Sequence, residues 1–137
     1  MTQTAHSNRP DMDIEADIID VIAHYPPLQA DRYHLHIEVR DGEVILSGHV
    51  RSMISRRTLL ERAAQVRGVS SVSSGQLYDE ETIRMEAGQQ IARGVIANVK
   101  YGAVILTGAQ PEGMTSEDVA RSVSLIPGVE RVVTRFE

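Results

Sequence analysis

The sequence predicts an α+β protein of two tandem units, each folding in the order helix, strand, strand, helix, strand. In each unit a small three-stranded mixed sheet is expected to have two helices packed on one face. The first observation behind this prediction is an internal repeat, because a shift of 60 positions places Gly42–Gly48 over Gly102–Gly108 without a gap. The second is that the matches fall on core-type apolar positions and on turn glycines, where a common backbone requires them. The turn glycines are Gly42, Gly48, Gly68, Gly102, Gly108 and Gly128.

The repeat also predicts the domain organisation. Residues 1–10 are a terminal segment without an apolar run, and they are expected to be a disordered tail. Residues 11–78 are predicted to form the complete first unit. Residues 79–137 are predicted to form a trimmed second unit, because almost no connector separates its first helix from its hairpin.

The first helix is indicated by apolar residues at i, i+4, i+7 and i+8. Asp11 or Asp13 is predicted to cap its start, and acidic residues favour the positive end of the helix dipole. Pro26-Pro27 is predicted to end it and to open a connector that extends to His34. The apolar positions are Ile14, Ile18, Val21 and Ile22.

A hairpin follows over residues 35–50, where apolar and polar residues alternate around Asp41-Gly42, a pair typical of two-residue turns. One face is expected to be apolar and buried, and the other polar and exposed. The turn predicts four cross-strand pairs: Arg40 with Glu43, Glu38 with Ile45, His36 with Ser47, and His34 with His49.

A second helix is predicted from about Met53 to Val66, with Leu59 and Ala63 in its buried stripe, followed by a third strand over Val69–Leu77. The second unit repeats this order. Its predicted elements are a helix over Thr82–Ala92, a hairpin over Val95–Thr107 around Tyr101-Gly102, a helix capped by Thr115 and Asp118, and a strand over Val129–Phe136.

Composition excludes several kinds of function. The chain contains no cysteine, so it forms no disulfide, thiolate metal site or cysteine nucleophile. The net charge of −5 and the 4% aromatic content argue against binding to nucleic acid. No signal peptide or membrane-spanning run is visible, and we therefore expect a cytoplasmic protein.

These residues resemble the BON domain, a family named from bacterial osmotic-stress and nodulation proteins. Its pattern is an apolar helix, a segment reading V-x-V-x-x-G-x-V-x-L-x-G-x-V, a further helix, and a Gly-Val-x-x-Val strand. Residues 14–77 match nearly throughout, and residues 79–137 match more weakly. The matching positions are Ile37, Val39, Gly42, Val44, Leu46, Gly48, Val50, Gly68, Val69 and Val72.

The resemblance implies a non-enzymatic binding module, with no catalytic residues to transfer and no cofactor. Similar domains associate with phospholipid or the cell envelope, and some act in osmotic stress, chaperoning or potassium binding. A membrane phospholipid surface or a protein is therefore the expected partner. Two alternatives stay open, an ion-binding sensor for a metal or potassium and a homo-oligomeric scaffold.

Three histidines and a carboxylate are predicted to share the outer face of the first hairpin, and such a group can bind zinc, nickel or copper. The alternative is a histidine-rich face exposed to solvent. The candidate metal ligands are His34, His36, His49 and Glu38.

A basic segment over Arg51–Arg67 includes the second predicted helix, and such a helix could contact lipid phosphates or RNA. Its candidate residues are Arg51, Arg56, Arg57 and Arg62. The alternative is ion pairing with the acidic first helix, or simple solvation.

The outer face of the second hairpin is unusually apolar for an exposed sheet surface, which predicts an interface. Its residues are Ile96, Ala103, Ile105 and Ala109. The partner could be the other unit of the same chain or a second chain.

Overall fold

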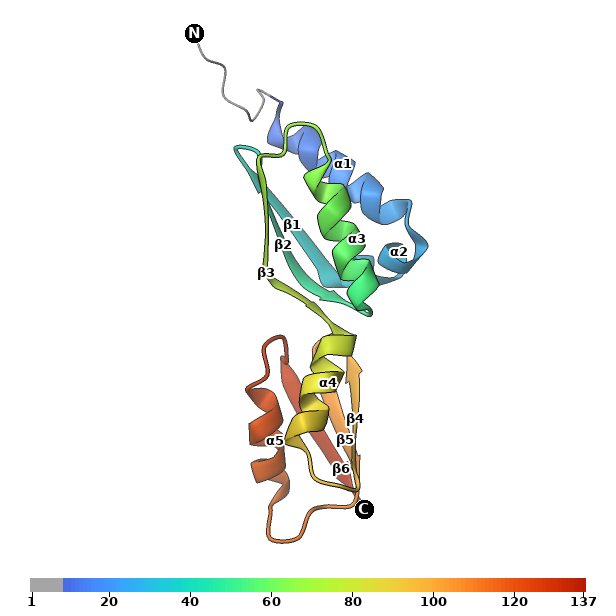
Figure 1. Cartoon of the computed structure of the whole chain (residues 1–137), viewed down its shortest axis with the longest axis vertical. Helices are drawn as coiled ribbons and strands as arrows, with labels where there is room; N and C mark the ends of the chain where they lie inside the picture. The colour runs from blue at the N-terminus through green and yellow to red at the C-terminus, as the bar shows by residue number, and fades with distance from the viewer. Residues whose placement is uncertain (1–8) are drawn as a thin grey trace. The chain divides into compact units, whose positions relative to one another are not determined.

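The computed structural model describes residues 9–137, which divide into two compact units (Figure 1). The first unit comprises residues 9–50 and 54–77, and the second comprises residues 51–53 and 78–137. Each contains a three-stranded sheet with helices, so the predicted α+β class and its mixed sheets are confirmed. Residues 1–8 of the predicted tail lie outside the described part of the chain.

The first sheet has the strand order β1-β2-β3, and β1 and β2 are antiparallel in the predicted hairpin register. The first helix ends before Pro26, as predicted, and the connector between it and the hairpin, for which no element is predicted, is itself helical. Pro26 and Pro27 occupy the first turn of α2, where a missing N–H leaves no intrahelical bond unmade. The elements are α1 (Asp11–Ala23), α2 (Pro26–Asp31), the 3-10 helix η1 (Arg32–His34), β1 (Leu35–Arg40), β2 (Glu43–Val50), α3 (Met53–Ala64) and β3 (Ser71–Asp79).

The core of the first unit lies between the sheet and the helices. Alternate residues of β2 point inward, and the i, i+4 stripes of α1 and α3 meet them, as the periodicity predicts. The buried residues are Ile14, Ile18, Ile22, Leu28, Val44, Leu46, Val50, Leu59, Ala63 and Leu77.

The second unit repeats this arrangement without a counterpart of α2. Asp79 caps its first helix, because its Oδ2 accepts a hydrogen bond from the Thr82 backbone N–H at 2.8 Å. The helix therefore begins two residues before the predicted start. The elements are α4 (Glu80–Gln90), β4 (Val95–Lys100), β5 (Ala103–Gly108), α5 (Ser116–Ser124) and β6 (Arg131–Phe136). Its buried core comprises Ile83, Ala87, Val95, Val99, Val104, Leu106, Val119, Val123 and Ile126.

The two hairpins have the same register at an offset of 60 residues. The first ladder runs from Leu35 opposite Gly48, and the second from Val95 opposite Gly108. Both glycines have positive φ angles, 111° and 94°, and a Cβ on Gly48 would overlap the carbonyl oxygen of His34. Glycine is required here because the incoming chain crosses the strand end at contact distance.

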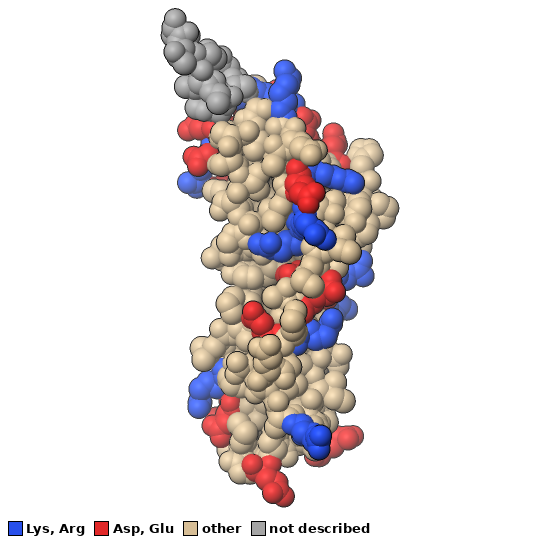
Figure 2. All heavy atoms as spheres, in the orientation of Figure 1, with Lys and Arg blue, Asp and Glu red and all other residues tan. Residues whose placement is uncertain are grey.

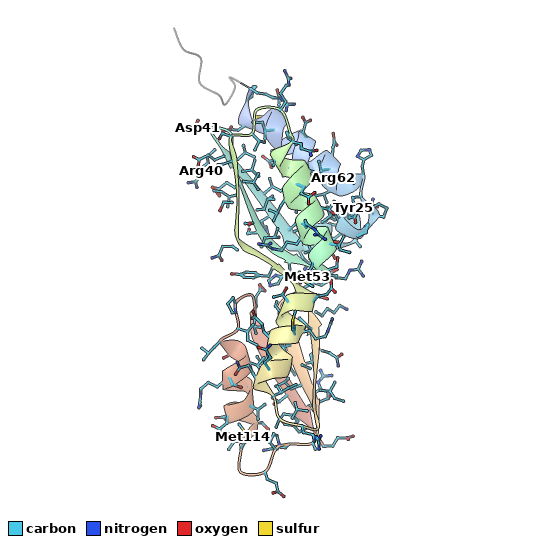
Figure 3. The ribbon with its side chains drawn as sticks, viewed as in Figure 1. Tyr25, Arg40, Asp41, Met53, Arg62 and Met114 are labelled. Carbon is cyan, nitrogen blue, oxygen red and sulfur yellow. The ribbon has the colours of Figure 1, made fainter. Side chains whose placement is uncertain are left out.

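The turn of each hairpin is held by a carboxylate from the first residue of the unit's first helix. Asp11 accepts hydrogen bonds from the N–H groups of Asp41 and Gly42 at 2.9 and 3.1 Å, with Asp41 labelled in Figure 3. Glu80 accepts the N–H of Tyr101 in the same way. The predicted capping role of Asp11 or Asp13 is wrong, since Pro10 precedes α1 and no side chain caps it.

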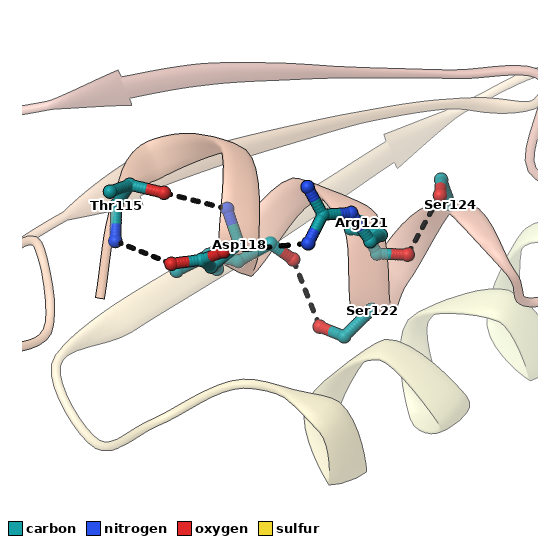
Figure 4. A network of polar contacts seen from close by, with 6 residues as sticks. Thr115, Asp118, Arg121, Ser122 and Ser124 are labelled. Atoms are coloured by element: carbon teal, nitrogen blue, oxygen red, sulfur yellow. Dashed lines mark hydrogen bonds and ion pairs between the residues drawn. The ribbon is translucent and has the colours of Figure 1, made fainter. Parts of the chain in front are cut away.

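The start of α5 is fixed by a reciprocal pair of hydrogen bonds, as the sequence predicts. The Thr115 hydroxyl accepts the Asp118 N–H at 3.0 Å, and the Asp118 carboxylate accepts the Thr115 N–H at 3.1 Å (Figure 4). These bonds from Thr115, backbone first, lower the pKa of Asp118 from its ordinary value of 3.8. Arg121 lowers it further by its charge.

No helix in the described part of the chain has the length and apolar character that crossing a bilayer requires.

Replacing Asp11 with Ala should destabilise the first unit by about 2 kcal/mol, because two backbone N–H groups lose a charged acceptor. Urea unfolding measures the loss, and hydrogen exchange should show reduced protection at the amides of Asp41 and Gly42. Asp13→Ala is the matched control, since it removes a carboxylate from the same exposed helical turn. Equal effects of the two substitutions would contradict the bracing role of Asp11.

Acidification should remove the stabilisation that Asp118 contributes. Its pKa is lower in the folded chain than its ordinary 3.8, so the unfolded chain binds this proton more readily. The contribution is complete above pH 3.8 and is lost as the pH falls through the folded pKa. Melting temperatures should therefore separate wild type from Asp118→Asn at neutral pH and converge in acid. Glu117→Gln, which removes a charge from the same turn without breaking the cap, is the control, and a constant gap would contradict the assignment.

Candidate functional site

The predicted metal site is not assembled. The ladder of β1 and β2 begins at Leu35 opposite Gly48, so the predicted pair of His34 and His49 lies outside it, with His34 in η1. Beyond Gly48 the alternation of the strand breaks, because its φ of 111° interrupts the extended backbone. His49 and Val50 are consequently both buried.

The remaining two candidate ligands lie elsewhere on the hairpin. His36 and Glu38 are exposed on the outer face of β1, and Glu38 forms an ion pair of 2.6 Å with Arg40. Among residues 9–137 no group of three or more His, Asp or Glu side chains is arranged to hold a metal ion. Within the same residues every buried side-chain nitrogen and oxygen has a hydrogen-bond partner.

The candidate basic residues separate into structural and exposed members. The Arg56 guanidinium donates to the carbonyl oxygens of Leu77 at 2.8 Å and Ser74 at 3.2 Å, and thereby ties α3 to β3. Arg62 lies over the ring of Tyr25, 4.9 Å from its centre (Figure 3). Arg57 is exposed on α3 and Arg51 is exposed just before it, and lipid binding by these arginines stays a prediction.

The sequence offered ion pairing between these arginines and the first helix as an alternative. In the first helix, Asp17 instead forms an ion pair with Arg9 at 2.7 Å. On the surface in view, Figure 2 shows acidic and basic side chains interspersed on each unit. That surface therefore carries no extended field of one sign.

Of the four residues of the predicted interface, Ile96, Ala103 and Ile105 lie on the face of the second sheet opposite its core, and Ala109 follows the end of β5. Their role as an interface stays a prediction. Ile96 is 58% exposed, Ala109 is exposed, Ile105 is half-buried, and Ala103 is buried between its strand neighbours Lys100 and Arg131. Ile96 and Ile105 are thus the two of these residues that expose large apolar side chains.

The third strand adds a residue that the sequence analysis missed. Val133 pairs with Ile105 across the parallel β5–β6 ladder and is half-buried on the same face. The apolar row therefore extends through Ile96, Ile105 and Val133. The signal that could have found Val133 was parallel pairing of the last strand, which places alternate residues of neighbouring strands on one face.

Three exposed cations surround this apolar row. Lys100 and Arg131 lie on either side of Ala103, and Arg135 pairs with Thr107 at the other end of β6. In the part of the chain that the structure describes, none of the three forms an ion pair. We define the outer sheet face as Ile96, Lys100, Ile105, Arg131, Val133 and Arg135.

The corresponding face of the first unit is different in kind. It carries His36, Glu38, Arg40 and Glu43, with Ile45 as its large apolar residue on β2. Its charges are mixed and one pair is internally neutralised. The outer sheet face of the second unit is therefore the one with an apolar centre and a single sign of charge.

These features define a class of protein, small α+β domains in which helices cover one face of a three-stranded sheet. Residues 10–77 match the BON domain model, so this segment of the chain is identified as a BON domain. No curated protein sequence matches the chain.

Among solved structures, the C-terminal domain of CdsD, the structural protein of the type III secretion system of Chlamydia trachomatis, has a similar fold. The TM-score is 0.65 at 18% identity, and the match covers 94% of this chain and 66% of that one. A further CdsD structure matches with a TM-score of 0.39 and 16% identity, over 90% of this chain and 91% of that one. This chain spans 66% of the length of the first structure.

Replacing Arg56 with Ala should destabilise the first unit by about 2 kcal/mol, because charged hydrogen bonds between α3 and β3 are lost. Arg57→Ala removes an exposed arginine one position along and should change stability by less than about 0.5 kcal/mol. Thermal and urea unfolding measure both. If Arg56→Ala left the stability unchanged, this guanidinium would be free to bind a ligand.

Proposed function

We propose that this chain is a non-enzymatic interaction module that binds an acidic partner surface through its outer sheet face. The observation that carries the proposal is the exposed apolar row of Ile96, Ile105 and Val133 with Lys100, Arg131 and Arg135 around it. Exposed apolar side chains gain free energy when a partner removes them from water. A cationic rim selects partners of negative charge.

The magnitudes favour a partner that supplies both contacts. Complete burial of a large aliphatic side chain contributes about 1.5–3 kcal/mol, and these side chains are partly buried already. Exposed ion pairs contribute about 0–1 kcal/mol each. The apolar row therefore supplies most of the affinity, and the cations supply orientation and selectivity.

The second unit supports this role as a variant of the first. We regard residues 79–137 as a trimmed BON-like copy, because both hairpins share one register and both turns donate a backbone N–H to a carboxylate of the leading helix. Two copies with a common core and different outer faces fit a division of labour, in which the second unit binds. An anionic phospholipid surface is one acidic partner of this kind, in keeping with the family.

Vesicle co-sedimentation tests the membrane as partner. The wild-type chain should sediment with vesicles containing phosphatidylglycerol and remain in solution with phosphatidylcholine alone, and added salt should weaken the binding. The triple variant Lys100→Glu, Arg131→Glu, Arg135→Glu should lose binding at least tenfold. Arg84→Glu, which reverses one exposed arginine of α4 outside the face, is the control.

Two results distinguish an error in the proposed binding surface from an error in the proposed partner. Equal binding by the triple variant and wild type, in this assay and in sedimentation of the protein alone, would show that the outer sheet face is not a binding site. Absence of vesicle binding by wild type would remove the membrane as its partner.

A further inference from the structure

The outer side of α1 carries a second exposed apolar strip that the core does not use. Met12 is 80% exposed and Ile19 is 50% exposed, and the exposed Ala16 and Ala23 continue the same line. Their spacing of i, i+4, i+7 and i+11 places them on one side of the helix. The buried residues Ile14, Ile18 and Ile22 occupy the opposite side.

Exposed carboxylates flank this strip. At 100° per residue, Asp13 and Asp20 lie along one border and Glu15 along the other. We define the acidic helix face as Met12, Asp13, Glu15, Ala16, Ile19, Asp20 and Ala23. It has an apolar centre and a negative rim, which is the reverse of the charge pattern of the outer sheet face.

The acidic helix face also borders a hollow. Glu15, Ile19 and Ala23 line one wall of a cavity of about 520 Å³ whose other wall includes Leu35 and Ile37 of β1. The strip is therefore not flat, and a protruding side chain of a partner has apolar space to enter beside Ile19.

We propose that the acidic helix face of one copy of this chain binds the outer sheet face of a second copy. This inference rests on the proposed function, because it names the acidic partner of the outer sheet face. Three carboxylates of one surface meet three cations of the other, and each apolar strip covers the other.

The dimensions of the two faces agree. From residue 12 to residue 23 the helix strip is about 17 Å long, at 1.5 Å per residue. A six-residue strand is about 20 Å long, and three strands spaced about 4.8 Å apart give a platform wide enough for one helix. The inner face of the same sheet already accepts helices in this manner, through the cores of α4 and α5.

The contact has a consequence for assembly. The two faces are different surfaces, so a copy that uses its sheet face in one contact keeps its helix face available for the next. Such heterologous contacts build rings or open chains rather than closed dimers. The acidic helix face belongs to the first unit and the outer sheet face to the second, so both units are needed for one copy to join two others.

Sedimentation of full-length protein tests the proposal. The weight-average mass of wild type should rise with concentration above the monomer mass of 15.1 kDa, and high salt should lower it. Ile19→Glu on the helix face and Ile96→Glu on the sheet face should each weaken association at least tenfold. Leu125→Glu is the matched control, because it charges an apolar residue that is 79% exposed and outside both faces.

Mixing the two defective variants makes the test specific. The Ile19→Glu chain keeps an intact sheet face and the Ile96→Glu chain keeps an intact helix face, so an equimolar mixture should form one-to-one dimers that do not grow. Melting temperatures close to that of wild type would show that the variants are folded, as expected for substitutions at exposed sites.

Each remaining outcome overturns the inference. The inference is wrong if the wild-type chain stays monomeric over the concentration range, whether or not its two faces bind each other within one chain. It is also wrong if association resists either substitution, or if the mixture stays monomeric. In those cases, vesicle binding that depends on Lys100, Arg131 and Arg135 would still support the proposed function. If the wild-type chain neither bound vesicles nor associated with itself, the proposed function and this inference would both be wrong.

Discussion

The fold depends on one recurring contact, the carboxylate that holds the hairpin turn. Both central residues of each turn have positive φ angles, a conformation that costs free energy for Asp41 and Tyr101. The carboxylate compensates by accepting the turn N–H groups, while the next strand region donates to the turn glycine carbonyl, from Ser70 in one unit and Glu130 in the other. The donor and acceptor are 30 residues apart in the first unit and 21 in the second. The same contact therefore forms in the unit that contains α2 and in the unit that has no counterpart of it.

This contact determines which surfaces are left for function. The start of the leading helix is fixed to the hairpin tip, so one side of the helix and one face of the sheet are committed to the core. What remains are the far side of α1 and the outer faces of the sheets, and these differ between units in charge and polarity. A common fold thus carries distinct surfaces, and function resides in the surfaces rather than in the fold.

The sequence predicted those features that depend on local periodicity and turn chemistry. Asp41-Gly42 fixes the register of β1 and β2, and the apolar stripes locate the core. It does not predict contacts between residues far apart in the chain. Asp11 is therefore predicted as a helix cap, although its carboxylate accepts a hydrogen bond from the N–H of Asp41, 30 residues away. His49 was misplaced because strict alternation was assumed beyond Gly48, where the backbone leaves the extended region. Val133 was missed because its neighbours on the sheet come from a parallel pairing.

Net charge and local charge act over different distances in this chain. The net charge of −5 repels other copies at long range, but at physiological ionic strength that repulsion is screened beyond about 8 Å. Opposed charges in a dehydrated contact are screened far less. Random encounters between copies are therefore disfavoured, whereas the arrangement that brings the carboxylates of α1 against the cations of the second sheet is selected. Specificity then arises from the opposite charges of the acidic helix face and the outer sheet face, and a chain with the same fold but no such difference between faces would lack it.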